Sequence, residues 1–228
     1  MRAPSILLIL LAALLASIPP AGAAPVALIQ GTASVPNESE RSYAQSLTRN
    51  LDRWLTELNV PHEAVSDEQA GAALRKARVA ILGYNPNPPA AEMAELKAFV
   101  RRGGKLIVFY AAEPELATLL HVKLGRYQAA DTAGPWSAMR FNEQAPPHLP
   151  ATVFQESRNI RPVYPADGTA RVIAVWETAP GKKPADPAWV QSESGFWMTH
   201  VLLDDGDTAN KKQMLLGLIA SCDPSVWE

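Results

Sequence analysis

The chain has 228 residues, of which 47% are hydrophobic and 19% charged, so it can bury a full core in one large domain. Its 21 basic and 23 acidic residues nearly balance, which argues against a basic surface for nucleic acid. Cys222 is the single cysteine, so an intrachain disulfide is excluded and the fold must be stable by packing alone. We interpret Cys222 as a small apolar core residue rather than a nucleophile.

The first 23 residues have the features of a cleavable signal peptide. Arg2 supplies the positive start, an apolar run covers residues 6–18, and Ala21-Gly22-Ala23 fits the small-residue rule for cleavage. The apolar run is shorter than the roughly 20 residues that a transmembrane helix needs. We expect cleavage after Ala23 and a periplasmic or secreted bacterial protein with no membrane association afterwards. An uncleaved N-terminal anchor is the alternative.

The remaining residues, 24–228, are expected to form one α/β domain. Its first half alternates apolar runs with helical patterns. The expected strands are 25–30, 62–65, 78–83 and 103–110, and the expected helices begin near Asn37, Asp67, Pro89 and Glu113. Asn37 followed by Glu40 has the spacing of a helix-capping box. This alternation predicts a flavodoxin-like parallel sheet with helices on both faces.

The second half, about residues 125–203, is predicted to be a β-rich extension of this core. Proline is frequent there and favours edge strands and loops. The expected strands are 126–130, 137–141, 160–164, 171–178 and 195–203. Asp207 is then expected to cap a last helix whose inner face carries Met214, Leu215 and Leu218.

The strand 103–110 runs into the turn Ala111-Ala112-Glu113-Pro114, which opens a helix. With the preceding strand and loop, residues 78–120 resemble the class I glutamine amidotransferase-like superfamily. In a related branch of that superfamily this turn reads Cys-x-Gly-Pro, which aligns Ala111 with the nucleophilic cysteine. The resemblance therefore implies the fold without the amidase or protease activity, and no catalytic residue is carried over.

A second resemblance covers the segment from Gly195 to Asp205, the pair Asn210-Lys211 and the closing helix. It is similar to the ends of amidotransferase-like domains attached to bacterial glycoside-hydrolase-like proteins, and to the trimerisation domain of some β-galactosidases. The resemblance implies a non-catalytic accessory or interaction module in carbohydrate processing. Its expected partner is a glycan or another protein, and it implies no cofactor.

Ligands of open α/β sheets bind outside the carboxyl ends of the strands. The residues predicted to bind a ligand there are Thr32, Tyr84, Asn85, Tyr110, Glu113, His200 and Asp204. Their aromatic, amide and acidic groups suit a polar ligand such as a sugar. Trp136, Trp189 and Trp197 are further candidates for a glycan or partner surface.

Other interpretations remain open for the same residues. Glu113 can simply favour a helix N-terminus, and His200 can be a core histidine in an apolar strand. A hydrolase with an unusual site would need Glu113, His200 and Asp204 around one pocket. A structural domain would instead form a homo-oligomer that buries Trp197 or the last helix. The acidic run 204–207 could hold calcium but lacks the spacing of an EF-hand, and no metal site is predicted.

Overall fold

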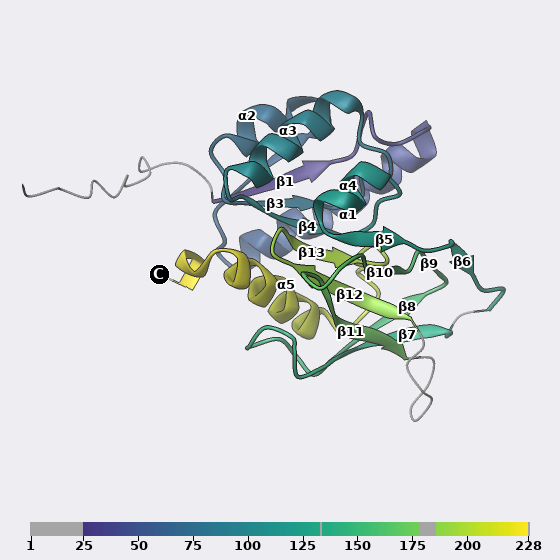
Figure 1. The fold of residues 1–228 in the computed structure, drawn as a ribbon. Helices are drawn as coiled ribbons and strands as arrows, with labels where there is room; N and C mark the ends of the chain where they lie inside the picture. Colours follow the sequence, from purple (N-terminus) through teal and green to yellow (C-terminus); the bar gives the residue numbers. More distant parts are fainter. Residues whose placement is uncertain (1–24, 133, 178–185, 228) are drawn as a thin grey trace, which may run out of the picture.

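A computed structural model describes residues 25–132, 134–177 and 186–227 (Figure 1). The predicted signal peptide lies outside the described residues. None of the helices within the described ranges is long and apolar enough to cross a membrane.

A nine-stranded sheet forms the centre of the molecule, in the order β2-β1-β3-β4-β13-β12-β11-β7-β8. The first five of these strands run parallel, and the last four continue the sheet in antiparallel fashion. The strands are β1 (Val26–Gln30), β2 (His62–Ser66), β3 (Val79–Leu82), β4 (Lys105–Val108), β7 (Trp136–Phe141), β8 (Thr152–Ser157), β11 (Arg171–Glu177), β12 (Pro187–Ser192) and β13 (Gly195–Met198). This mixed α/β sheet confirms the predicted flavodoxin-like fold class.

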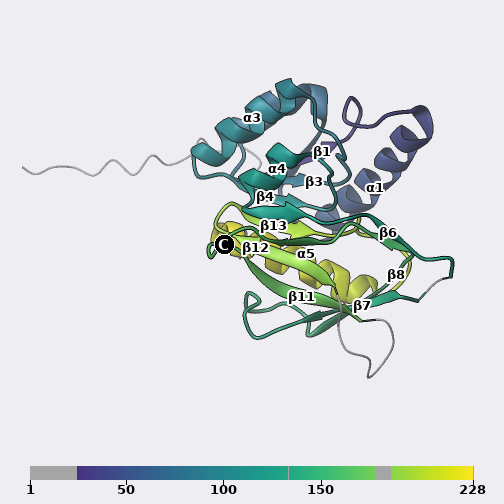
Figure 2. The ribbon, with the colours of Figure 1, turned by 45° about the vertical axis from the view of Figure 1, so that its right-hand side comes forward.

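Helices cover both faces of the sheet, as Figures 1 and 2 show. They are α1 (Glu38–Glu57), α2 (Ala70–Leu74), α3 (Ala90–Arg101), α4 (Pro114–Leu119) and α5 (Thr208–Cys222), with short 3-10 turns at η1 (Asp67–Gln69) and η2 (Pro224–Trp227). Side chains alternate across a strand, so β1 sends Val26 and Leu28 toward α1 and α5, and Ala27 and Ile29 toward α2, α3 and α4. Two apolar layers result, one on each face of the sheet.

The first helix begins where its sequence pattern predicts. The side chain of Asn37 accepts a hydrogen bond from the backbone N–H of Glu40 at 3.0 Å, which satisfies one of the free donors at the helix start. Leu47, Leu51, Trp54 and Leu55 are buried at spacings of three and four. This amphipathic pattern places the opposite side of α1 at the surface.

The β-rich half differs in detail from the prediction. Strands β8 and β12 were not expected, and the expected strand 195–203 ends at Met198. The expected strand 126–130 is shorter in the structure, where β6 covers only Gln128–Ala129 and pairs with β9 (Asn159–Ile160). A second two-stranded sheet forms between β5 (Val122–Leu124) and β10 (Val163–Pro165). The boundaries of these strands depend on pairing with strands far away in the sequence, so they cannot be predicted from local β-propensity.

Candidate functional site

A cavity of about 290 Å³ opens where the carboxyl ends of the parallel strands meet the β-rich half. Its lining combines tyrosine rings with polar groups from both halves of the chain. The lining residues are Glu40, Tyr43, Tyr84, Tyr110, Tyr127, Asn159, His200 and Val201. The position agrees with the general rule that open α/β sheets bind ligands beyond the strand ends.

Tyrosine rings form one wall of this cavity. Tyr84 follows β3, Tyr110 follows β4, and Tyr43 belongs to α1. The Tyr43 and Tyr84 rings meet edge to face with centroids 5.5 Å apart, and the Tyr84 and Tyr110 rings lie 5.7 Å apart at 32°. We call these three residues the tyrosine cluster. It offers a ligand fixed aromatic surface next to phenolic hydroxyls.

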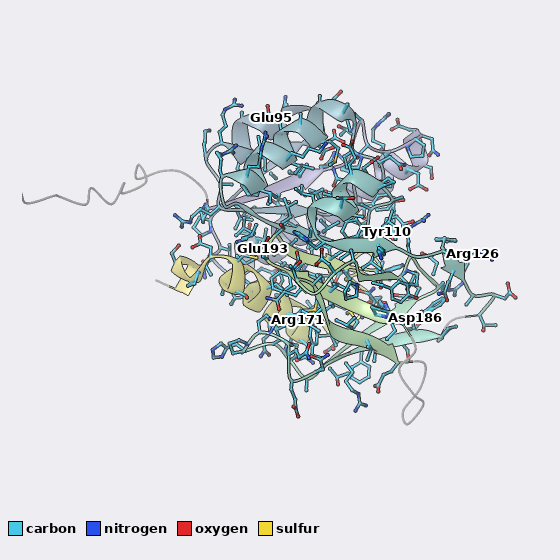
Figure 3. All side chains as sticks on the ribbon, viewed as in Figure 1. Glu95, Tyr110, Arg126, Arg171, Asp186 and Glu193 are labelled. Atoms are coloured by element: carbon cyan, nitrogen blue, oxygen red, sulfur yellow. The ribbon has the colours of Figure 1, made fainter. Side chains whose placement is uncertain are left out.

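Tyr110 has an unusual backbone conformation, with φ at +138°. A bulky residue at positive φ is strained by about 1–3 kcal/mol and persists only where the surrounding structure imposes it. The residue with this conformation at the end of β4 is Tyr110, one position before Ala111, which the sequence resemblance aligns with a nucleophilic cysteine. Ala111 is fully buried and packs among α3 and α4. Figure 3 labels Tyr110 in the centre of the molecule, between the two halves.

His200 lies in the irregular segment after β13 and is only 6% exposed. Its Nδ1 is 2.8 Å from the carbonyl oxygen of Val201 and 3.2 Å from Gln155 Nε2. Because the nearer carbonyl can only accept, we assign the proton to Nδ1. Burial lowers the pKa of His200, partly opposed by that hydrogen bond and by the charge of Asp205. The ring is therefore neutral at pH 7, and Nε2 keeps a lone pair that can accept a hydrogen bond. Gln155 of β8 donates to the same Val201 carbonyl at 2.9 Å and so holds this segment in place.

Glu40 fixes the orientation of the tyrosine cluster. The hydroxyl of Tyr84 donates to Glu40 Oε2 at 2.6 Å. Burial, followed by this hydrogen bond, raises the pKa of Tyr84, and burial with the Glu40 charge raises that of Tyr43. Both phenols therefore remain protonated and able to donate throughout the physiological pH range.

Three of the predicted ligand-binding residues meet at this cavity: Tyr84, Tyr110 and His200. The other four lie elsewhere and have structural partners. Thr32 donates to Asp67 from its backbone N–H at 2.8 Å and also from its hydroxyl, and Asn85 is buried and donates to Glu92 Oε1 at 3.3 Å. Glu113 accepts from the backbone N–H of Glu115 at 3.1 Å as the N-cap of α4, and Asp204 pairs with Arg53 at 2.8 Å.

The hydrolase interpretation needed Glu113, His200 and Asp204 around one pocket. His200 lines the cavity, but neither Glu113 nor Asp204 does. Among the described residues, no group of three or more His, Cys, Asp or Glu side chains is arranged to hold a metal ion. The cavity thus presents groups that bind through stacking and hydrogen bonds.

The tryptophans proposed as a surface were placed wrongly. Trp189 and Trp197 are at most 1% exposed, and Trp136 is 7% exposed. Trp189 packs edge to face on Phe109 with ring centroids 5.4 Å apart. The antiparallel strands continue the central sheet, so their aromatic residues face its helices and loops and fill the core.

Sequence reasoning missed Glu40, Tyr43, Tyr127 and Asn159 as part of the site. For Glu40 and Tyr43 a signal existed, because residues three apart on a helix lie on the same face. Tyr127 and Asn159 come from loops and short strands of the β-rich half, and only the tertiary fold brings them to the cavity.

No family model and no curated protein matches the chain. Its fold is similar to that of a ThuA-like protein from Bacteroides uniformis, with a TM-score of 0.64 and 15% identity over 86% of this chain and 90% of that one. It is also similar to alpha-L-fucosidase isoenzyme 2 from Paenibacillus thiaminolyticus, with a TM-score of 0.60 and 18% identity over 87% of this chain. The matched region is 33% of that enzyme.

A third similar structure is a GMP synthase protein from Thermoplasma acidophilum, with a TM-score of 0.55 and 9% identity over 88% of this chain and 95% of that one. These similarities show the fold: the chain shares the α/β fold of these proteins, as the resemblance of residues 78–120 implied.

Proposed function

We propose that this protein is an exported, non-catalytic binding module of bacterial carbohydrate processing, and that it holds a carbohydrate in the tyrosine-lined cavity. The observation that carries the proposal is the composition of that cavity. Aromatic rings stack on the apolar faces of sugars, and phenol, amide and imidazole groups hydrogen-bond to sugar hydroxyls. Tyr84, Tyr110, Asn159 and His200 supply this combination.

The chemistry at the end of β4 supports a binding role over catalysis. The resemblance aligns a nucleophilic cysteine with Ala111, and the side chain of Ala111 carries no group that could attack a substrate. His200 has no carboxylate hydrogen-bonded to its ring among the described residues. A general base normally needs such a partner to orient it and to stabilise its protonated form.

Isothermal titration of the protein with a panel of mono- and oligosaccharides tests the proposal, with Tyr110→Gly as the key variant. Glycine tolerates the positive φ of this position, so the variant should fold at least as stably as wild type while losing the stacking ring. We expect its affinity for the sugar to fall about tenfold or more, since one aromatic contact is worth roughly 1–2 kcal/mol.

Tyr164→Ala is the matched control, because Tyr164 is an exposed tyrosine of β10 outside the cavity. It should bind like wild type. The proposal is wrong if no sugar binds, if Tyr110→Gly binds as well as wild type, or if the wild-type protein hydrolyses glycosides or amides at enzyme-like rates.

A further inference from the structure

Glu40 is the single carboxylate among the described residues that line the cavity. One of its oxygens accepts the Tyr84 hydroxyl, but a hydroxyl does not neutralise the charge. No ion pair formed within the described ranges includes Glu40, and its neighbour Arg41 pairs with Glu38 instead. The cavity therefore contains a carboxylate that has no cationic partner among the residues that the structure describes.

The other lining groups do not compensate this charge. The described lining includes neither lysine nor arginine, and burial keeps the His200 ring neutral at pH 7. The phenols of Tyr43 and Tyr84 stay protonated. At neutral pH the site is thus negatively charged, which disfavours anions and favours a cationic group.

The tyrosine cluster adds a second attraction for a cation. The face of an aromatic ring is electron-rich and attracts an ammonium group within about 6 Å of its centre. Tyr43, Tyr84 and Tyr110 lie side by side on one wall, and Glu40 is bound to the middle ring. An ammonium group at this wall would contact both the carboxylate and the rings.

We propose that the ligand of this cavity is an amino sugar, a hexose that carries a free protonated amine, and that Glu40 determines this specificity. The inference rests on the proposed function, because it names the ligand of the same site. The ammonium group donates to Glu40 beside the tyrosine cluster. The sugar hydroxyls hydrogen-bond to Asn159 and to the free Nε2 of His200. Sugar acids and sugar phosphates bring a negative charge toward Glu40 and are rejected.

Calorimetric titration with glucosamine, glucose, N-acetylglucosamine and glucuronate at neutral pH tests this specificity. We expect glucosamine to bind about tenfold more tightly than glucose, the size of one partly desolvated charge contact. N-acetylglucosamine, whose amine is neutralised, should bind like glucose, and glucuronate should not bind.

Glu40→Gln is the diagnostic variant, because glutamine can still accept from the Tyr84 hydroxyl but carries no charge. It should bind glucosamine no more tightly than glucose, so that the ratio of the two affinities falls to about one. Glu38→Gln, one position removed from the helix cap and outside the cavity, is the matched control and should keep the preference.

The outcomes separate the two proposals. Equal affinities for glucosamine and glucose overturn the amino-sugar specificity and leave the proposed function standing. If none of these sugars nor the wider panel binds, the proposed function fails and the specificity with it. If choline binds as tightly as glucosamine, the inference is also overturned, because the site then recognises the ammonium group alone and not the sugar.

Discussion

At the scale of single residues, two buried carboxyl groups near the carboxyl ends of β1, β2 and β3 have pKa values that are shifted in opposite directions. Asp67 accepts from the backbone N–H groups of Thr32, Ala33 and Ser34 at 2.8, 3.1 and 2.9 Å. Burial raises the pKa of Asp67, but these hydrogen bonds and the Thr32 hydroxyl outweigh it and lower the pKa overall. Asp67 therefore stays ionised and holds the loop after β1.

Glu92, in the first turn of α3, is only 3% exposed and lies close to the charge of Asp67. Its Oε1 accepts from Asn85, and its Oε2 has no hydrogen-bond partner in the described structure. Burial and then the Asp67 charge raise the pKa of Glu92 to about 8. The carboxyl group is therefore protonated at neutral pH.

This proton makes stability depend on pH. Between the ordinary pKa of 4.5 and about 8, the unfolded chain has released the proton that the folded protein keeps. The contribution of Glu92 to the free energy of unfolding should thus fall by up to about 1.4 kcal/mol per pH unit across this window, and level off above it. Glu92→Gln should lack this fall, which urea denaturation at a series of pH values measures.

Glu95→Gln is the control for that experiment. Glu95 lies one turn after Glu92 on α3, and both line a groove between α2 and α3. Glu95 is partly exposed, and Figure 3 labels it in the helical layer. Its stability curve should run parallel to that of wild type. A Glu92→Gln curve parallel to wild type would show that Glu92 is ionised in the folded protein.

At the scale of elements, the acidic run 204–207 covers the edge of the sheet. The outward backbone N–H groups of Phe154 and Glu156 on β8 donate to Asp207 at 2.8 Å and Asp205 at 2.7 Å. Asp207 occupies the N-cap position of α5, as expected, but its side chain serves β8 and Asn210 rather than the helix backbone. These two backbone N–H groups of β8 are therefore occupied and not available to pair with a strand of another chain.

Lys211 of α5 holds the acidic run 204–207 in place. Its side chain is fully buried, pairs with Asp205 and donates to the carbonyl oxygen of Leu203 at 2.9 Å. Asp205→Ala should cost about 3 kcal/mol, because it leaves a buried cation without its partner. Adding Lys211→Met should restore most of that loss. Chemical denaturation of the single and double variants measures both changes.

Asp204→Ala is the control for this pair. Asp204 forms a more exposed ion pair with Arg53, with side chains 34% and 46% exposed, so its loss should cost less than about 1 kcal/mol. If Asp205→Ala lowers the free energy of unfolding no more than Asp204→Ala does, the ion pair between Lys211 and Asp205 does not stabilise the segment 204–207.

At the scale of the whole molecule, the parallel pairing of β13 with β4 joins the strands of the β-rich half of the chain to those of the first half. Gly195 starts β13 at φ +137°, and a Cβ there would lie 1.9 Å from the carbonyl oxygen of Leu106. Gly195→Ala should therefore separate the strands and cost at least about 3 kcal/mol. Thermal unfolding measures this loss.

Gly168→Ala provides the comparison, because no atom of the described residues lies within 4 Å of the added methyl group. It should change stability by less than about 0.5 kcal/mol. Similar melting temperatures for the two variants would mean that the sheet can open at β13 without loss.

The sequence by itself determined the parallel half of the fold and part of the site. Strands such as β1 and β3 are buried on both faces, so their apolar runs were visible without a structure. Tyr84 and Tyr110 were found as candidate ligand-binding residues because parallel strands end at a common edge of the sheet.

Only the tertiary structure decided the rest. It placed Trp189 and Trp197 in the core and brought Asn159 and Tyr127 to the cavity. It also placed Glu40 beside Tyr84, with no cationic partner within the described part of the chain. It also showed that the buried Oε2 of Glu92 has no hydrogen-bond partner among the described residues. These properties depend on contacts between residues far apart in the chain, such as the 44 positions between Glu40 and Tyr84, and local sequence patterns contain no record of such contacts.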